Sequence, residues 1–416
     1  MATIFIQIAS YRDTELLPTL RDCVSKARHP ENLRFGICWQ RDETETLGEF
    51  ADDSRFRVRE HHYSVSKGLG WARQQTQSLY DGEDYSMQVD AHQRFVEDWD
   101  VILIDMLNSI DSEKPLLTCY APPYDPLNED QPLSHTPSSL GFDQFTPEGA
   151  LLIRPTHMKD WQARQSPVPG RYFSGHFSFT IGQWCRDVLY DPEYYFHGEE
   201  ISMAVRSYTH GYDIFYPHRV VVWHEYTRKY RTTHWNDHVP EKGATVSWYK
   251  RNEDSQRRMR ILFKQEEADI DFRHLGFGPA RSLEHYERYA GVNFRLKAVQ
   301  RYTFENHEPP NPEIYGSDEE WVSNNVDDFW CRVLLPEGTY DPKTDYETLY
   351  VSINNALGES IYRKDMHGDE VRAIFDQRRP AFIQPYKSFE EAAGWTVRLK
   401  DSAGEELAEI TRPIVR

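Results

Sequence analysis

Short apolar segments alternate with amphipathic ones over the first 90 residues, and this alternation constrains the fold more than any other feature of the sequence. Buried strands are predicted for residues 3–9, 33–40, 56–62 and 85–89. Helices are predicted after the first and third of these strands. Such alternation builds a mostly parallel sheet, with ligands bound beyond the carboxyl ends of the strands. We therefore predict an α/β fold, and Ser10 and Asp90 lie at two of its strand ends.

The next part of the chain continues the mixed pattern. Further strands are predicted for residues 116–120, 149–155, 173–181 and 220–223, and helices for residues 100–110, 199–210 and 248–263. Residues 122–147 are rich in Pro, Asp, Asn and Ser, and we expect them to form a long loop near the site. Gly211 is suited to a left-handed cap on the helix before it.

Prolines mark the best candidate for a domain boundary. Residues 306–312 contain three of them, and proline sustains neither a helix nor a central strand. Beyond this run apolar residues alternate with period two, which is typical of strands in a sandwich. We therefore expect a main α/β domain over residues 1–306, with 227–306 as a helical extension that covers the site. A linker over 307–319 and a small β-rich domain over 320–416 follow.

Charge and cysteine usage exclude several classes of protein. The chain has 67 acidic and 48 basic residues and a net charge of −19, which argues against non-specific binding of nucleic acid. No residue run resembles a signal peptide or a membrane span. The five cysteines lack CxxC spacing, which fits a reducing compartment. We expect a cytoplasmic protein with neither nucleic acid nor a membrane as partner; the oligomeric state is left open.

The triplet Asp90-Ala91-His92 directly follows a predicted strand. Residues i and i+2 share one side of an extended chain, so the carboxylate and the imidazole can grip one ion. Oxygen with a single nitrogen suits Mn²⁺ or Mg²⁺ better than a thiolate-seeking metal. Such an ion can hold a diphosphate and neutralise its charge as it leaves. The same triplet is also typical of a solvated turn, so both interpretations stand on these residues alone.

The sequence downstream of the triplet resembles the polypeptide N-acetylgalactosaminyltransferases. Their Asp-x-His motif is followed by a glycine-bearing aromatic strand, here with Gly175-His176, and by a helix start, here Gly198-Glu199-Glu200. The resemblance implies that His224, at the end of a later strand, completes the metal site. Two departures from the pattern, His176 for glycine and Glu200 for asparagine, leave the preferred sugar and acceptor open.

A closer resemblance covers most of the first 300 residues, to the cytoplasmic polypeptide N-acetylglucosaminyltransferases that modify hydroxyproline of a ubiquitin-ligase subunit. It rests on the segments 8–13 (IASYRD), 67–73 (KGLGWAR), 89–95 (VDAHQRF) and 275–283 (LGFGPARSL). The resemblance implies a Rossmann-like GT-A domain, UDP-GlcNAc as donor, Mn²⁺ or Mg²⁺ as cofactor, and a retaining reaction. The acceptor is then a polypeptide hydroxyl or a glycan.

The resemblance also implies roles for residues that bind the donor. Ser10, Tyr11 and Arg12 would line the uridine pocket, although a plain turn with a solvated arginine is the alternative. Gly68 and Gly70 would let the backbone pass close to the ribose or phosphate. Arg73 would lie near the diphosphate. In the run 225–231, Arg228 and its neighbours would close over the diphosphate and exclude water, or form a solvated basic stretch.

The candidate catalytic residues are Glu199, Glu200 and His176. The carboxylates would bind sugar hydroxyls and orient the acceptor, although acids at a helix start also gain from the helix dipole. His176 would contact the sugar or the acceptor, or pack in the core. A same-face attack, with the leaving phosphate taking the acceptor proton, is favoured over Glu199 as a nucleophile.

Other functions remain open at this level. The enzyme could use another UDP-sugar or a glycan acceptor. A metal-dependent phosphohydrolase built on Asp90, His92 and His224 is a second class, although such sites commonly need more carboxylates. A protein that binds carbohydrate or protein without catalysis, with a degenerate transferase domain, is a third.

Overall fold

The computed structural model describes residues 2–414 apart from residues 130, 132, 229, 230, 313–316 and 378. Contacts divide the chain into a larger unit, Met1–Tyr315, and a smaller one, Gly316–Arg416. The division falls inside the segment predicted as a linker. Among the described helices, none combines the length and the apolar character that crossing a bilayer requires.

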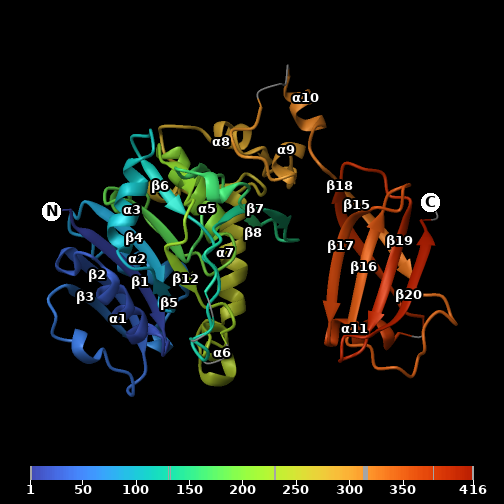
Figure 1. Cartoon of the computed structure of the whole chain (residues 1–416), viewed down its shortest axis with the longest axis horizontal. Coiled ribbons are helices and arrows are strands. Elements are labelled where there is room, and N and C mark those ends of the chain that lie inside the picture. The colour runs from blue at the N-terminus through green and yellow to red at the C-terminus, as the bar shows by residue number, and fades with distance from the viewer. Residues whose placement is uncertain are drawn as a thin grey trace. The chain divides into compact units, whose positions relative to one another are not determined.

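A mixed sheet forms the centre of the larger unit (Figure 1). Its strands, in spatial order, are β3 (Phe56–His62), β2 (Leu33–Arg41), β1 (Ile4–Tyr11), β4 (Tyr85–Asp90), β10 (Phe177–Ile181), β6 (Pro115–Thr118), β11 (Asp213–Tyr216) and β9 (Val168–Pro169). Strands β3, β2, β1 and β4 run parallel. Antiparallel β10 joins β4 to β6, β11 is parallel to β6, and β9 is antiparallel to β11. The predicted α/β class with a mostly parallel sheet is confirmed.

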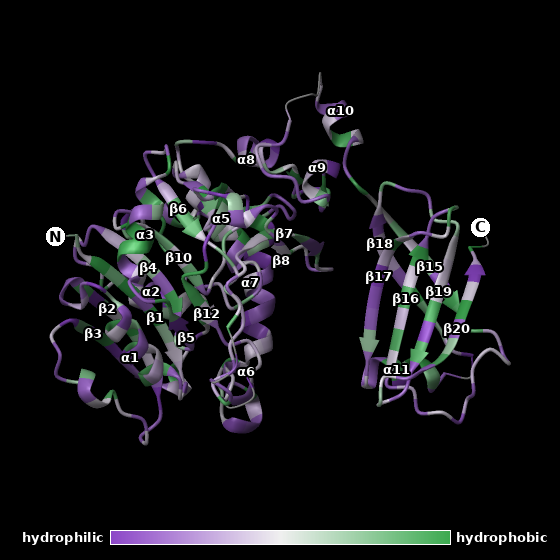
Figure 2. Cartoon of the chain, in the orientation of Figure 1, coloured by the Kyte–Doolittle hydropathy of each residue, from purple (hydrophilic) through white to green (hydrophobic). Residues whose placement is uncertain are grey.

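Helices cover both faces of the sheet. The described helices of the larger unit are α1 (Leu16–Lys26), α2 (Leu69–Gln77), α3 (Trp99–Asn108), α4 (Trp184–Asp187), α5 (Glu199–Thr209), α6 (His234–Asp237), α7 (Trp248–Leu262), α8 (Leu283–Ala290) and α9 (Arg301–Phe304). Ile6 of β1 belongs to a core cluster with Leu20 of α1 and Leu103 of α3. On the opposite face, α2 packs closely on β2: a Cβ added at Gly36 would meet the ring of Phe5 and the carbonyl oxygen of Thr76 in α2. Figure 2 shows these central strands as apolar and α7 as largely hydrophilic.

Part of the predicted loop over residues 122–147 is a strand. β7 (Ser138–Phe145) pairs antiparallel with β8 (Leu151–His157). The expectation of an irregular segment was wrong there because Leu140 and Phe142 alternate with polar neighbours and both are buried. Two shorter ribbons complete the unit's strands: β5 (Gln93–Phe95) with β12 (Val222–His224), and β13 (Val292–Asn293) with β14 (Ala298–Val299).

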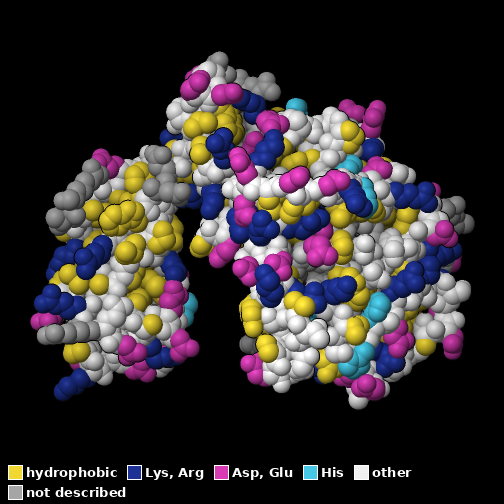
Figure 3. All heavy atoms as spheres, turned by 180° about the vertical axis from the view of Figure 1, so that it is seen from behind, with side chains coloured by type: hydrophobic (Ala, Val, Ile, Leu, Met, Phe, Trp, Pro, Cys, Tyr) yellow, Lys and Arg dark blue, Asp and Glu magenta, His cyan; other side chains and the backbone are white. Residues whose placement is uncertain are grey.

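The smaller unit is β-rich, as predicted. β15 (Asp327–Leu334) pairs with β18 (Ala381–Ser388), and a second antiparallel sheet has the order β17 (Ser360–His367), β16 (Thr348–Asn354), β19 (Gly394–Lys400) and β20 (Glu406–Pro413). Helices α10 (Asp318–Ser323) and α11 (Asp369–Phe375) accompany the strands. Val333 of β15 shares a core with Val351 and Val397 of the other sheet, as in a sandwich. Figure 3 shows apolar side chains at the surface of this unit, where Trp330 of β15 is 71% exposed.

Gly70 fixes how α2 meets the chain before α5, and its substitution tests this packing. A Cβ at Gly70 would lie 2.4 Å from the carbonyl oxygen of Asp191 and 2.6 Å from that of Tyr194. Because the obstacle is backbone, we expect Gly70→Ala to lower the free energy of unfolding by about 1–3 kcal/mol. Thermal denaturation measures this effect. Gly276→Ala is the matched control, since its nearest contact is an ordinary 3.4 Å to Phe272 Cβ; equal melting temperatures would contradict the packing argument.

Candidate metal and nucleotide-sugar site

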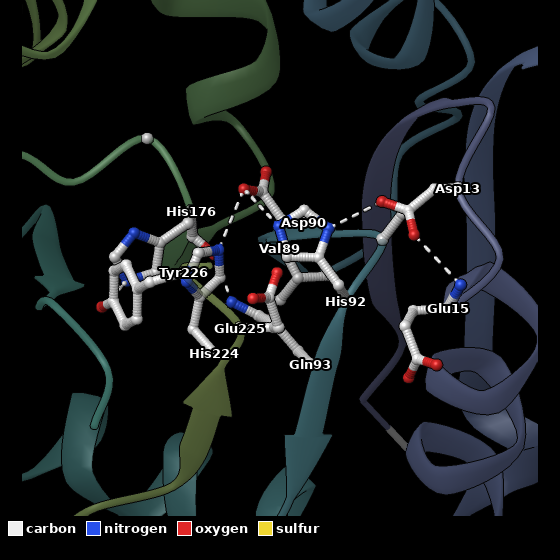
Figure 4. A network of polar contacts seen from close by, with 12 residues as sticks. Asp13, Glu15, Val89, Asp90, His92, Gln93, His176, His224, Glu225 and Tyr226 are labelled. Atoms are coloured by element: carbon white, nitrogen blue, oxygen red, sulfur yellow. Dashed lines mark hydrogen bonds and ion pairs between the residues drawn. The ribbon is translucent and has the colours of Figure 1, made fainter. Parts of the chain in front are cut away.

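Asp90, His92 and His224 converge at the carboxyl edge of the sheet (Figure 4). Asp90 is the last residue of β4, and His224 is the last residue of β12, which pairs with β5 directly after His92. The Oδ2 atom of Asp90 is 3.2 Å from Nε2 of His224 and 3.5 Å from Nε2 of His92. One ligand atom from each residue lies within 4.8 Å of the others, which is close enough to hold one cation.

Asp13 orients His92 for ligation. Its Oδ2 atom lies 2.8 Å from Nδ1 of His92, and both side chains are buried. A histidine that donates its Nδ1–H to a carboxylate leaves the Nε2 lone pair free for a metal. Burial by itself would raise the pKa of Asp13, but the hydrogen bond and charge of His92, with Arg231 nearby, lower it. Asp13 is therefore a carboxylate that sets the tautomer of a ligand.

A buried arginine holds Asp90 in place. Nη2 of Arg73 is 2.5 Å from Oδ1 of Asp90, and the side chain of Arg73 is 1% exposed. Arg73 also donates to the carbonyl oxygens of Val89 (2.8 Å) and Gly175 (2.9 Å). Burial alone would raise the pKa of Asp90, but its hydrogen bond to His224 and the charge of Arg73 keep it well below its usual range. The predicted place of Arg73 near the diphosphate stays a prediction. In the structure its Nη atoms bond Asp90 and the local backbone, whereas its buried Nε atom has no hydrogen-bond partner among the described residues.

His176 supports His224 from the side. The two rings stack with centroids 4.2 Å apart and planes 24° apart. Nε2 of His176 accepts a hydrogen bond from the backbone N–H of Ala121 at 3.0 Å, so this atom is not free to ligate. Burial, with the nearby His224, lowers the pKa of His176 well below its usual value and keeps the ring neutral. The geometry fits packing and positioning better than contact with the sugar.

Glu199 and Glu200 begin α5 beside the same strand ends. The Tyr190 hydroxyl donates to Glu199 at 2.7 Å, and the Tyr120 hydroxyl donates to Glu200 at 2.8 Å. Glu200 also accepts from the backbone N–H of Gly175 at 2.9 Å. Burial raises the pKa of Glu199 to about 7, and burial with the neighbouring Glu199 raises that of Glu200 to about 8. These carboxyl groups hold protons near neutrality, in contrast to Asp90.

Gly175 joins the two clusters. Its carbonyl accepts from Arg73 while its N–H donates to Glu200, so a single peptide segment touches the holder of Asp90 and the carboxyl cluster. A Cβ at Gly175 would lie 3.0 Å from Oε2 of Glu199. This close approach explains the glycine in the motif, since any side chain would crowd the carboxylate.

The residues at the end of β1 divide between the pocket and its surroundings. Tyr11 lines the pocket, whereas Ser10 is fully buried and its carbonyl accepts from Gln40. Arg12 forms ion pairs with Asp42 (3.3 Å) and Asp237 (2.8 Å). Arg12 thus links the end of β1 to α6 through its ion pair with Asp237. The sequence predicted a uridine contact or a solvated arginine at this position, but not this ion pair.

The two glycines predicted at the donor site, Gly68 and Gly70, have different surroundings. Gly68 lines the pocket with a φ of 112°, a conformation that favours glycine. Gly70 does not line it, because the backbone of Asp191 and Tyr194 packs against it. The predicted place of Gly70 beside the ribose or phosphate stays a prediction, and the contacts seen in the structure are those of helix packing.

The pocket in front of the triad is covered by the chain that follows β12. Its lining includes Ala9, Tyr11, Asp13, Gly68, Asp90, His92, Tyr195, His224, Glu225, Arg228, Arg231, Thr232, His234 and Trp235. Arg228 lies between the rings of Phe196 (5.8 Å) and Trp235 (5.4 Å). The pocket has a volume of about 170 Å³ and is partly open to solvent.

Sequence reasoning missed several residues of the site. Asp13 bonds His92, Tyr120 bonds Glu200 and Tyr190 bonds Glu199. Gln88 donates to the Tyr190 hydroxyl and to the carbonyl of Gly175, so it supports the carboxyl pair indirectly. Asp13 carried one usable signal, since it follows a predicted strand end within the segment 8–13. The tyrosines carried none, because only the fold brings them to α5.

Comparison with known proteins agrees with this geometry. The sequence model of the family described as Glycosyltransferase (GlcNAc) matches residues 3–52 and 48–296. The chain belongs to this GlcNAc glycosyltransferase family. No curated protein matches the sequence with significance.

Two solved structures are similar at low identity. GalNAc-T7 with UDP, GalNAc and Mn²⁺ is 14% identical, with 63% of this chain and 48% of that chain covered and a TM-score of 0.47. TarS 1–349 of S. aureus in complex with UDP-GlcNAc is 10% identical, with 65% and 68% covered and a TM-score of 0.42. The chain thus spans about half the length of the GalNAc-T7 chain that it matches.

The protonated carboxyl pair makes stability depend on pH. Because folding raises the pKa of Glu199 to about 7 and that of Glu200 to about 8, their contribution is complete below the ordinary pKa of about 4.5 and is lost as the pH rises through 7 to 8. We expect Glu200→Gln to lose less melting temperature between pH 5 and pH 8 than the wild type, by a few degrees. Calorimetric scans measure this. Glu97→Gln, at an exposed position, is the control, and parallel pH profiles for all three proteins would contradict the assignment.

Proposed function

We propose that the protein is a retaining glycosyltransferase of GT-A type that moves GlcNAc from UDP-GlcNAc to a hydroxyl group, with a polypeptide as the acceptor. Mn²⁺ or Mg²⁺ is bound by Asp90, His92 and His224. The observation that carries the proposal is the convergence of these ligand atoms at the edge of the sheet, beside the covered pocket. Membership of the GlcNAc glycosyltransferase family supports the donor class.

The donor set fits a divalent cation. One carboxylate oxygen and two imidazole nitrogens form a donor set that divalent first-row transition ions accept, Mn²⁺ among them. Nδ1 of His224 is buried and has no hydrogen-bond partner among the described residues, so its ring is not fixed by a competing bond there. A cation held here supplies charge neutralisation for the departing diphosphate. Asp13 and Arg73 then act as positioning residues that keep His92 and Asp90 aimed at it.

The carboxyl pair supports same-face attack rather than a covalent intermediate. Burial raises the pKa of Glu199 to about 7, and the Tyr190 hydroxyl donates to its Oε1 atom, so this carboxyl group is part of a structural hydrogen bond. Glu199 and Glu200 are better suited to exchange hydrogen bonds with sugar and acceptor hydroxyls. The leaving phosphate then takes the acceptor proton, and the protein contributes positioning and electrostatic stabilisation.

The pocket supports a nucleoside site at the end of β1. The Tyr11 ring and the backbone at Gly68 line it, and we assign them to uridine and ribose. Buried Ser10 shapes the backbone at the end of β1, beside Tyr11. Arg12 holds α6 next to this strand end through its ion pair with Asp237. Arg228 lines the same pocket and is assigned to the diphosphate. With the cover closed, water is kept from the activated sugar, which limits hydrolysis.

A donor screen read by UDP release tests the function. Purified protein is mixed with Mn²⁺ and a UDP-sugar panel, with and without a hydroxyproline-, serine- or threonine-containing peptide. We expect UDP-GlcNAc to give the most UDP, with EDTA abolishing the signal. Preference for another sugar or a glycan acceptor would redirect the specificity. Binding of donor without release in any mixture would favour a non-catalytic binding protein, and phosphate release from nucleotide would favour a phosphohydrolase.

Removing a ligand of the triad tests the metal assignment. We expect His224→Ala to weaken Mn²⁺-dependent UDP binding by at least about tenfold, because one of three ligands is lost. Asp90→Asn is expected to act likewise, although it also leaves the buried charge of Arg73 without its anion. Isothermal titration calorimetry measures binding, and circular dichroism checks the fold. His157→Ala, at an exposed position of β8, is the matched control; unchanged UDP affinity in both site variants would refute the triad.

A further inference from the structure

A second pocket of the larger unit, which we call the hairpin pocket, lies between the β7–β8 hairpin and the chain at the end of α9. It has a volume of about 570 Å³ and is partly open to solvent. Its lining includes Ser139 of β7, Arg154 and Thr156 of β8, Lys159, and Asn306 after α9. None of the residues assigned above to the cation, the nucleoside, the diphosphate or the sugar lines it. The hairpin pocket is therefore separate from the donor site.

One face of the hairpin forms a wall of this pocket. Arg154 and Thr156 share that face of β8, because residues i and i+2 of a strand point to the same side. Gly141 is the cross-strand partner of Arg154 and lies on the same face. A Cβ at Gly141 would collide with the side-chain oxygen of Asn306. The face that carries Arg154 is therefore turned toward the chain after α9, and the pocket lies between them.

The carboxylates on the α9 side of the pocket already have partners. Glu305 forms ion pairs with Arg301 (2.6 Å) and His307 (3.1 Å). Glu308 forms an ion pair with Arg164, and both of these side chains line the pocket. The negative charge of this wall is therefore balanced within the protein.

Two cations of the hairpin wall have no such partner. Arg154 and Lys159 are exposed residues of the lining, and neither forms an ion pair with any residue that the structure describes. Asp160, next to Lys159 in the chain, is the remaining acid of the lining. Two unpaired cations thus stand against one acid, and the pocket carries an excess of positive charge. The whole chain has a net charge of −19, so this excess is local.

We propose that the hairpin pocket is an acceptor subsite, which binds carboxylate side chains of the polypeptide that receives the sugar. The inference rests on the proposed transferase function with a polypeptide acceptor. A chain of this net charge repels an acidic polypeptide over most of its surface, so recognition needs cations gathered at one place. Arg154 supplies a planar fork that matches a carboxylate with two hydrogen bonds, and Lys159 supplies a point charge in the same pocket.

Strand β7 leads from the carboxyl pair to this pocket. Ser138, its first residue, donates its hydroxyl to the carbonyl oxygen of Tyr120 at 2.7 Å. The hydroxyl of the same tyrosine donates to Glu200 at 2.8 Å. Ser139, the next residue of β7, already lines the pocket, and a strand advances about 3.3 Å per residue. An extended acceptor with its hydroxyl group at Glu200 can therefore place side chains several residues away in the hairpin pocket.

Binding of acidic and neutral peptides tests this subsite without turnover. Fluorescent peptides with a central hydroxyproline, serine or threonine carry two glutamates at spacings of about three to eight residues on either side, and a matched set carries glutamines. We expect the wild type to bind the best glutamate peptide about tenfold more tightly than its glutamine counterpart, measured by fluorescence polarisation. Arg154→Gln and Lys159→Gln are each expected to lose about two- to fivefold of this affinity, with binding of the glutamine peptides unchanged.

UDP release gives a second readout on the same variants. With Mn²⁺ and UDP-GlcNAc, we expect KM for the glutamate peptide to rise by about the same factor in Arg154→Gln and Lys159→Gln, while kcat holds, because neither residue lines the donor pocket. Arg59→Gln is the matched control, since it removes one exposed positive charge from β3, an edge strand of the central sheet. Circular dichroism checks the fold of each variant.

Four outcomes would overturn or separate the proposals. Equal binding of glutamate and glutamine peptides overturns the subsite, as does a loss in Arg59→Gln equal to that in Lys159→Gln, which is a general charge effect. Displacement of the peptide by sodium phosphate, at an ionic strength where potassium chloride does not displace it, would make the pocket a small-anion site and overturn the polypeptide ligand. UDP release that is equal with both peptide sets removes only the subsite. Selective binding of glutamate peptides without UDP release from any mixture supports the pocket and removes the transferase.

Discussion

The ion pair between Arg73 and Asp90 is the interaction on which the rest of the site depends. Arg73 is buried on α2, and its guanidinium reaches the end of β4 and the carbonyl of Gly175 before β10. The ion pair and these two hydrogen bonds join α2, the end of β4 and the segment before β10 around one buried guanidinium. The position of Asp90 follows, and so does that of the Gly175 peptide that holds Glu200.

This arrangement shifts the pKa values of neighbouring carboxyl groups in opposite directions. Asp90 faces Arg73 and His224, and its pKa lies well below the usual range, so it can bind a cation. Glu199 and Glu200 are buried with tyrosine hydroxyls, and their pKa values rise to about 7 and about 8. One end of the site is thus suited to a diphosphate with its cation, and the other to neutral hydroxyl groups.

The chain after β12 contacts two separate parts of the pocket. Through Arg231 it contacts His92 and Asp13, and through Asp237 of α6 it contacts Tyr11 and Arg12 at the end of β1. The cover therefore touches both the proposed cation site and the proposed nucleoside site.

The sequence by itself determined the α/β class, the strand ends at Ser10 and Asp90, the helix start at Glu199 and the β-rich C-terminal part, because these depend on local periodicity and on residues close together in the chain. It could not give β7, since its pattern is masked by polar turn residues, nor the contacts that Arg73, His176 and Gly70 make. Each of those depends on a partner far along the chain: Gly175 for Arg73, His224 for His176, and Tyr194 for Gly70. Spacing predicts which face a side chain occupies, but burial and the competition for hydrogen-bond partners decide what it does. Only the tertiary structure placed Arg231 on the lone pair of His92.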